Sequence, residues 1–309
     1  MNLPEREIVV VGSANIDLVT RVHRCPKPGE SLIGRSFMTV TGGKGANQAV
    51  AAARLGAKTT FIGCVGHDAF GAMQRQGLAD AGVDVTYLKT HPTEPTGTAV
   101  ILVADEGQNA IVVTPAANSG LLPEDIIEIE PLIAGADAVL LQLEIPLITV
   151  EKTLDIARKH SVLSVLDAGP AQAVPAALLA KADLVSPNET EAEALTGIAV
   201  ASLDDARRAA EQLRAAGAPE VVMKLGARGA LYLGDEEIYA TAFKVEVVDT
   251  TAAGDAFTAA LALAWNALPK RPALRFANAA GALAATVPGA QPSMPHRDAV
   301  QRLLDQVAS

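Results

Sequence analysis

The residues most able to do chemistry lie in one short segment, DTTAAGD, which runs from Asp249 to Asp255. A strand-like run over 243–248 precedes it, and an apolar run over 256–265 follows it as a predicted helix. Free N–H groups and the positive end of a helix dipole make such a turn an anion site. Asp255 at its mouth could take a proton from a hydroxyl that attacks a phosphoryl group. An N-capping aspartate is an equally good structural interpretation.

A second candidate is the glycine-rich run TGGKGANQA at 41–49, which opens another predicted helix. A phosphate loop would need glycine where Met38 stands and serine or threonine where Gly45 stands, so that interpretation fails. A plain glycine turn remains possible. We favour close backbone approach to a polyhydroxylated ligand, with Lys44 and Asn47 donating hydrogen bonds, because such a concentration of glycine carries an entropic cost.

Three further segments place polar or glycine residues after predicted strands. Asn15 and Asp17 alternate along an extended segment and share a face, which suits sugar hydroxyls or a turn with Asx hydrogen bonds. Asn188 and Glu191 fit a helix capping box, or a carboxylate that organises hydrated Mg²⁺. The run 221–229 is a strand that ends in a glycine-punctuated turn, which predicts a hairpin that could hold an adenine nucleotide.

Short β-branched runs alternate along the chain with longer alanine-rich runs. The predicted strands are 8–11, 59–62, 138–143, 163–166, 184–186, 221–225 and 231–233. The predicted helices are 46–55, 69–81, 148–160, 190–196, 204–216, 256–268 and 274–287. This alternation predicts a Rossmann-like α/β fold, in which a mostly parallel sheet has helices on both faces. Ligands in such sheets bind beyond the carboxyl ends of the strands.

Two regions, 14–41 and 96–116, read as extended segments without helices between them. The second predicts a hairpin of strands 99–103 and 110–113, joined through a turn at 105–107. Together they could form a small lid sheet within a single α/β domain over 1–309.

Composition excludes several classes of protein. The formal net charge of −10 disfavours a general nucleic-acid binder, which usually carries a basic patch. The longest apolar run, 256–265, is about half of a membrane span. The N-terminal residues lack a signal-peptide pattern, and Cys25 and Cys64 form no paired motif, as in a reducing compartment. We therefore expect a cytoplasmic protein with no nucleic-acid and no membrane partner.

These segments, in this order and spacing, resemble the ribokinase/phosphofructokinase-B-like family of sugar kinases over about residues 8–298. GGKGAN at 42–47 resembles the first signature of the family, and DTTAAGD resembles the second. The segments at 12–17, 187–193 and 289–293 bring the resemblance closest to the ribokinases. Some positions depart from the pattern. Lys224 stands where threonine or serine is common, and Asp167 with Ala168 replaces a more usual Asn-Pro pair.

The resemblance implies transfer of the γ-phosphoryl group of ATP to the 5-hydroxyl of D-ribose. Asp255 would then be the base, and the N–H groups of Ala252, Ala253 and Gly254 would form the anion hole. The implied sugar-binding residues are Asn15, Asp17, Gly43, Lys44, Asn47, Glu144 and Asp255. The implied nucleotide-binding residues are Asn188, Lys224, Gly226, Gly229, Gly254 and Asn278.

The same resemblance implies two metal ions and an assembly. Mg²⁺ would lie near Glu191. A monovalent cation, K⁺, would lie at Asp249, Thr251, Ala284, Val287, Gly289 and Ser293. The family also implies a homodimer formed through the lid sheet.

Alternatives remain on the sequence alone. A kinase of the same family for deoxyribose, a ketose or a nucleoside would carry similar motifs, although aromatics make up only 3% of the chain and offer little surface for stacking a base. A non-catalytic sugar-binding protein on the same scaffold is a further alternative, which the intact Asp255 and Gly254 disfavour. A nicotinamide-dependent dehydrogenase is disfavoured because no Gly-x-Gly-x-x-Gly follows the first strand.

Overall fold

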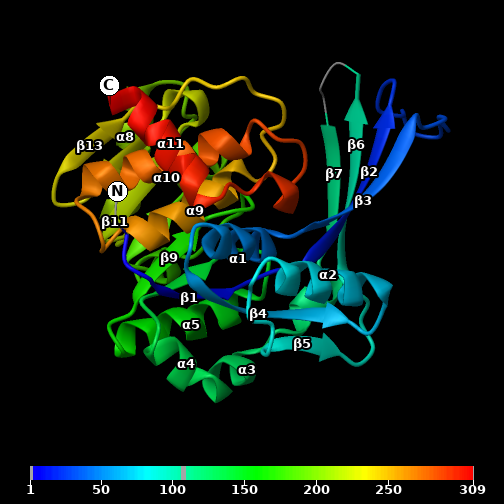
Figure 1. Cartoon of the computed structure of the whole chain (residues 1–309), viewed down its shortest axis with the longest axis horizontal. Helices are drawn as coiled ribbons and strands as arrows, with labels where there is room; N and C mark the ends of the chain where they lie inside the picture. Colours follow the sequence, from blue (N-terminus) through cyan, green and yellow to red (C-terminus); the bar gives the residue numbers. More distant parts are fainter. Residues whose placement is uncertain (1–2, 106–108, 309) are drawn as a thin grey trace.

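A computed structural model describes residues 3–105 and 109–308, and its main sheet has nine strands in the order β13-β12-β11-β10-β9-β8-β1-β4-β5 (Figure 1). Their bounds are β1 (Glu7–Val11), β4 (Lys58–Gly66), β5 (Leu88–His91), β8 (Ala138–Leu141), β9 (Leu163–Asp167), β10 (Leu184–Ser186), β11 (Glu220–Lys224), β12 (Ala230–Leu233) and β13 (Glu237–Ala240). All pairings are parallel except those of β12 with β11 and β13. The predicted mostly parallel sheet is confirmed.

Helices cover both faces of this sheet, because successive side chains of a buried strand point to opposite sides. Val10 of β1 belongs to the hydrophobic core that also contains residues of α1, α9, α10 and α11, whereas Val9 and Val11 belong to the core that contains residues of α3, α4, α5 and α8. The helices are α1 (Lys44–Arg54), α2 (Ala69–Asp80), α3 (Pro123–Glu128), α4 (Glu130–Ala134), α5 (Leu147–Lys159), α6 (Ala176–Leu179), α7 (Glu189–Thr196), α8 (Leu203–Ala215), α9 (Ala253–Ala264), α10 (Lys270–Ala284) and α11 (Arg297–Ala308). Three short 3₁₀ turns are η1 (Ala116–Gly120), η2 (Gly226–Arg228) and η3 (Gln291–Ser293).

A second sheet of four strands, which we call the lid sheet, has the order β3-β2-β6-β7 and projects from the main body at the upper right of Figure 1. Its strands are β2 (Asn15–Val22), β3 (Ser36–Gly42), β6 (Gly97–Ala104) and β7 (Asn109–Thr114). β6 and β7 form the predicted hairpin. Residues 106–108, which include most of its predicted turn, lie outside the described residues. β1 leads into β2 through only three residues, so the start of the lid sheet lies next to the carboxyl end of β1.

The predicted strand over 243–248 is wrong. This segment is irregular, and the N–H of Val248 donates to Ala285 O (2.9 Å) after α10 rather than to a neighbouring strand. Val247 and Val248 are each 59% exposed, so their β-branched side chains do not mark a buried strand. The strand in this part of the chain is β13, which lies just before it. The short elements β5, α3, α4 and α6, and the C-terminal α11, were also not predicted.

None of the helices formed by residues 3–105 and 109–308 combines the length and the apolar character needed to cross a bilayer.

Candidate active site

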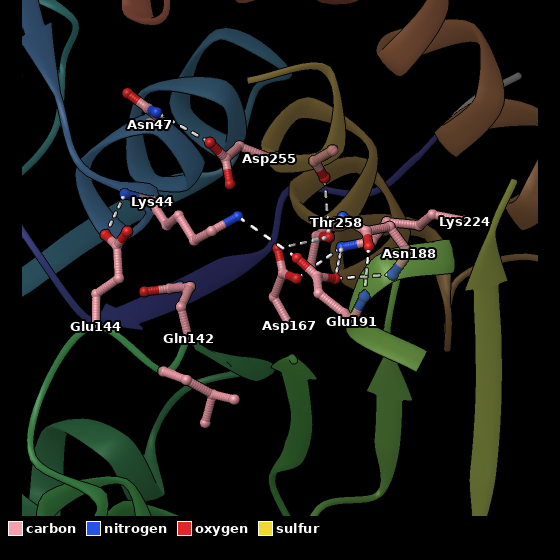
Figure 2. A network of polar contacts seen from close by, with 12 residues as sticks. Lys44, Asn47, Gln142, Glu144, Asp167, Asn188, Glu191, Lys224, Asp255 and Thr258 are labelled. Atoms are coloured by element: carbon pink, nitrogen blue, oxygen red, sulfur yellow. Dashed lines mark hydrogen bonds and ion pairs between the residues drawn. The ribbon is translucent and has the colours of Figure 1, made fainter. Parts of the chain in front are cut away.

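Polar residues from separate motifs meet at the carboxyl edge of the main sheet (Figure 2). β8 leads into Gln142 and Glu144, β9 ends at Asp167, Asn188 follows β10, and β11 ends at Lys224. Ligands of open α/β sheets bind in the crevice at this edge. The structure therefore brings these residues together where the alternation of strands and helices places a site.

Asp255 lies in the first turn of α9 and is only 4% exposed. Its carboxylate accepts hydrogen bonds from Asn47 Nδ2 (2.9 Å) and Gln48 Nε2 (3.2 Å), so α1 orients it. Ala252 occupies the N-cap position of α9. The interpretation of Asp255 as an N-capping residue is wrong, because its side chain bonds to α1 and not to its own helix.

The start of α9 presents backbone N–H groups beside this carboxylate. Ala252 has a φ of 58°, a left-handed conformation that is uncommon outside glycine, and it starts the helix three residues earlier than predicted. Ala253 N donates to Thr250 O (3.2 Å). Within the described ranges, the N–H groups of Ala252 and Gly254 meet no protein acceptor. These two groups and the helix dipole can bind an anion, whereas Ala253 already has a partner.

Asp255 and Asp167 are neighbouring acids of different strength. Gln48 Nε2 bridges them, since it also donates to Asp167 Oδ2 (2.8 Å). Burial raises the pKa of Asp255 to about 6, with Lys44 opposing the shift and Asp167 adding to it. Burial also disfavours ionisation of Asp167, but the ammonium groups of Lys224 and Lys44 outweigh it and hold its pKa below the usual range. Such a division leaves one acid charged and the other able to exchange a proton near neutral pH.

Asp17, near the start of β2, is a carboxylate without protein donors. Its Oδ2 lies 2.5 Å from the point where a Cβ on Gly42 would stand. No hydrogen bond from the described residues reaches it. Burial, then the charges of Glu144 and Asp255, raise the pKa of Asp17 to about 7. A half-buried carboxylate of this kind is costly unless a ligand supplies hydroxyl donors.

A cavity of about 310 Å³ is lined in part by Asn15, Asn118 and Glu144. Asn118 Nδ2 donates to Asn15 Oδ1 (2.7 Å), which fixes the orientation of the Asn15 amide. Glu144 accepts from Ser13 Oγ and from the backbone N–H of Lys44 (3.2 Å). Two of the predicted sugar residues, Asn15 and Glu144, therefore line this cavity.

Gly43 and Lys44 form the tight entry into α1. Gly43 has a φ of 90°, and a Cβ there would stand 2.6 Å from Asn15 N, so this position requires glycine. Lys44 Nζ lies 3.8 Å from Glu191 Oε1. In Figure 2, the Lys44 side chain extends toward Asp167 and Glu191.

Asn188 and Glu191 form the capping box that the sequence allows. Asn188 N donates to Glu191 Oε2 (2.7 Å), and Glu191 N donates to Asn188 Oδ1 (2.8 Å). The structural interpretation of this pair is thus confirmed. Glu191 also faces two ammonium groups, those of Lys44 and Lys224, at 3.8 and 3.6 Å.

The other predicted nucleotide residues gather at the hairpin of β11 and β12. Gly226 and Gly229 bound its turn. A Cβ on Gly229 would stand 2.1 Å from Ala240 O. Asn278 Nδ2 donates to the same oxygen (3.0 Å), so α10 and the hairpin meet at the end of β13.

The predicted monovalent-cation residues lie around Asp249. Its Oδ1 accepts from Thr251 N (2.9 Å) and Thr251 Oγ1 (2.6 Å), and its Oδ2 accepts from Gly289 N (2.9 Å). Asp249 N donates to Ala285 O (3.2 Å), at the end of α10. The remaining predicted members, in or near the turns after α10, are Ala284, Val287 and Ser293.

Sequence reasoning missed Gln48, Gln142 and Thr258, and noted Asp167 only as a departure. Gln142 Nε2 donates to Gln48 Oε1 (2.6 Å), which leaves Gln48 Nε2 facing the two acids. Gln48 had a usable signal, because it stands four residues after Lys44 and shares its helix face. Gln142 had no such signal beyond following a strand.

The chain also resembles known proteins along nearly its whole length. Residues 5–297 match the model of the pfkB family carbohydrate kinases. A ribokinase of Haemophilus influenzae is 42% identical over 305 residues, which cover 97% of this chain and 99% of that protein. A deoxyribokinase of Salmonella typhi is 38% identical over 253 residues, which cover 81% of this chain and 83% of that protein.

A solved structure extends the resemblance to three dimensions. Arabidopsis thaliana ribokinase, complexed with ribose and ATP, matches with a TM-score of 0.89 and 37% identity, and the match covers 97% of this chain and 99% of that chain. The family model, the ribokinase relative and the similar fold all point to the same class of protein as the motifs at the sheet edge, the carbohydrate kinases. The chain belongs to the pfkB family of carbohydrate kinases.

Proposed function

We propose that this protein is a sugar kinase that transfers the γ-phosphoryl group of ATP to the 5-hydroxyl of D-ribose, giving D-ribose 5-phosphate and ADP. The observation that carries the proposal is Asp255, which α1 holds at the N-terminus of α9 between the sugar and nucleotide residues. The ribokinase relative, and the ribokinase structure with ribose and ATP, support ribose as the substrate.

In the proposed reaction, Asp255 accepts the proton of the 5-hydroxyl as that oxygen attacks the γ-phosphorus. The bond between the γ-phosphorus and the bridging oxygen breaks, and its electron pair leaves with ADP. Free N–H groups at Ala252 and Gly254 stabilise the charge on the transferring group. Phosphoryl transfer depends mainly on such positioning and charge neutralisation.

The remaining predicted residues divide between the two substrates. We assign ribose binding to Asn15, Asp17, Gly43, Lys44, Asn47 and Glu144, which meet around the cavity and the start of α1. We assign the nucleotide to Asn188, Lys224, Gly226, Gly229 and Asn278. Figure 2 supports this division, because Lys44, Asn47 and Glu144 lie on one side of Asp255 in that view, and Asn188 and Lys224 lie on the other.

Mg²⁺ fits the site as a companion of the nucleotide. Among residues 3–105 and 109–308, no three His, Cys, Asp or Glu side chains gather into a metal-binding cluster. Mg²⁺ commonly keeps several waters and binds substrate phosphates with only one or two carboxylates. Glu191 would hold one of its waters, and the ion would neutralise phosphate charge.

The Asp249 turn suits a monovalent cation, since its carboxylate and nearby carbonyls are hard oxygen donors. We expect the phosphorylation rate to be higher in potassium than in sodium buffer at equal ionic strength, because the ion would stabilise the turn that leads into the anion site. Steady-state rates in matched chloride salts measure this. Equal rates would contradict the cation site.

The lid sheet supports the proposed homodimer. Strand register puts Val19, Met38, Ile101 and Ile111 in one row on the face that carries Asp17. Met38 is 46% exposed and Ile111 is 52% exposed, which is unusual for apolar residues that remain in water.

We expect Ile111→Glu to convert a dimer into a monomer in sedimentation velocity. Ile148→Glu is the matched control, because Ile148 is 61% exposed on α5, outside the lid sheet. A dimer that survives Ile111→Glu, or a wild-type monomer, would refute this interface.

We expect the kcat/KM for ribose to fall below pH 6–7, well above the range of an ordinary carboxyl group. Asp255 must be ionised to accept a proton, and Asp17 must be ionised to bind hydroxyls most strongly; their pKa values are raised to about 6 and about 7. Rate measurements at saturating MgATP test this. An acid limb near pH 4 would count against both assignments.

The proposed function itself is tested with an ATP-dependent panel of ribose, deoxyribose, fructose and nucleosides, read by ADP release. We expect the highest kcat/KM with ribose. Highest activity with deoxyribose would move the protein to the specificity of the Salmonella typhi relative. Sugar binding without ADP release would show a non-catalytic protein.

A further inference from the structure

Lys224 is a buried ammonium group with two carboxylate neighbours. Its side chain is 9% exposed, and its Nζ lies 2.6 Å from Asp167 Oδ1 and 3.6 Å from Glu191 Oε2. Asp167 has no exposed surface and also accepts from Gln48 and from Thr258 Oγ1 (3.3 Å). The two departures from the family pattern, at positions 167 and 224, therefore form a single contact.

The Lys224 ammonium also faces the start of α9. Lys224 Nζ lies 3.9 Å from the point where a Cβ on Gly254 would stand. Among the described residues, no other atom outside α9 and the residues next to Gly254 comes within 4 Å of that point. Gly254 itself is exposed and offers its N–H group to a ligand. A phosphate bound at this helix end would thus lie next to a fixed positive charge.

Stability alone does not explain this buried pair. Replacing a buried ion pair with well-packed apolar residues is often neutral or stabilising, because desolvation offsets the attraction. The site also holds the carboxylates of Asp255, Asp167, Glu191 and Glu144 beside the ammonium groups of Lys44 and Lys224. Without Lys224, the terminal phosphates of a nucleotide would approach a larger excess of negative charge.

We propose that Lys224 contacts the terminal phosphates of the nucleotide and that Asp167 is the residue that positions it. The inference rests on the proposed function and deepens it, because it names the group that recognises the phosphate end of ATP. Lys224 has three N–H donors. Asp167 takes one, and Glu191 lies beyond ordinary hydrogen-bond distance, so donors remain for phosphate oxygens.

The test compares the binding of MgATP and AMP by titration calorimetry, without sugar. The main variant is the double substitution Asp167→Asn with Lys224→Met, which leaves no unpaired charge in the core. We expect its Kd for MgATP to rise about 10- to 100-fold, as expected for a lost hydrogen bond to a charged group. The Kd for AMP should change less than about twofold, because AMP lacks the terminal phosphates.

A matched control removes another lysine–aspartate pair. Lys89 on β5 and Asp125 on α3 lie 2.8 Å apart, away from the site. The double variant Lys89→Met with Asp125→Asn should keep both dissociation constants. Asp167→Asn alone should weaken the preference for MgATP over AMP by a smaller factor, since the ammonium remains but loses its anchor.

Three results would overturn the inference. An unchanged preference in the Asp167→Asn, Lys224→Met variant would remove the phosphate contact. Equal weakening of MgATP and AMP would show that the pair only maintains structure. An unchanged preference in Asp167→Asn would remove its positioning role. The calorimetric test contains no sugar, so its result does not depend on ribose phosphorylation. A protein that failed to phosphorylate ribose would contradict the proposed function but not the phosphate contact of Lys224.

Discussion

Replacing Asp255 with asparagine is expected to lower kcat by about 10²–10⁴-fold, the range typical for loss of a general base. Asparagine has nearly the same shape and can keep contact with Asn47 and Gln48, but it cannot accept the hydroxyl proton. The carboxylate is 4% exposed, so bulk water does not readily replace it. Steady-state kinetics with ribose and MgATP measure the effect.

Binding measurements distinguish a loss of catalysis in Asp255→Asn from misfolding of the variant. Calorimetric affinities of Asp255→Asn for ribose and for MgATP should stay within about tenfold of wild type, since at most one interaction with the sugar is lost. Asp298→Asn, an exposed aspartate on α11, is the control and should keep its full kcat. Near-wild-type kcat in Asp255→Asn would refute the assigned role.

Replacing Asp17 with asparagine is expected to lower the kcat/KM for ribose by about a hundredfold. The carboxylate has no donor among the described residues, so sugar hydroxyls would be its partners, and hydrogen bonds to a charged group contribute about 1.5–3 kcal/mol each. The loss should appear mainly in KM, because the contact exists before and during phosphoryl transfer. The KM for ATP should change little.

The same substitution should stabilise the free protein at pH 8. The folded-state pKa of Asp17 is raised from its ordinary value of 3.8 to about 7, so ionisation costs stability as the pH rises from the first value to the second. Asparagine removes that cost. Thermal melts at pH 5 and pH 8 should show a clearly larger gain at pH 8, because the cost of ionising Asp17 grows from its ordinary pKa of 3.8 up to about 7. Asp80→Asn, exposed at the end of α2, should change neither activity nor melting temperature. A destabilised Asp17→Asn with normal ribose kinetics would contradict both expectations.

Sequence patterns predicted the main sheet well because its strands are buried on both faces and its helices are long. The prediction of a strand over 243–248 was wrong because it rested on the strand-forming side chains of Val247 and Val248. The backbone of this segment instead bonds to the end of α10, where Val248 N donates to Ala285 O. Short elements such as α6 carry too few residues for a periodic pattern.

The site was predictable where a motif holds its residues close in the chain, as with Lys44 and Asn47. It was not predictable where tertiary folding decides the partner. Lys224 and Asp167 are on separate strands, and the sequence alone marked both as unusual without joining them. The sequence also assigned the N–H group of Ala253 to the anion hole, but in the structure this group donates to Thr250 O within the local turn.

The three-residue link between β1 and β2 determines how far the proposed sugar site would move with the lid sheet. Asp17 stands two residues from the start of β2, whereas Val22 ends the strand about 23 Å from Asn15 at the usual rise per residue. A ten-degree rotation about this junction would displace the far end by about 4 Å and Asp17 by about 1 Å. In such a rotation the distal half of the lid sheet would move most, while the end that carries Asp17 would stay nearly stationary, as at the fulcrum of a lever.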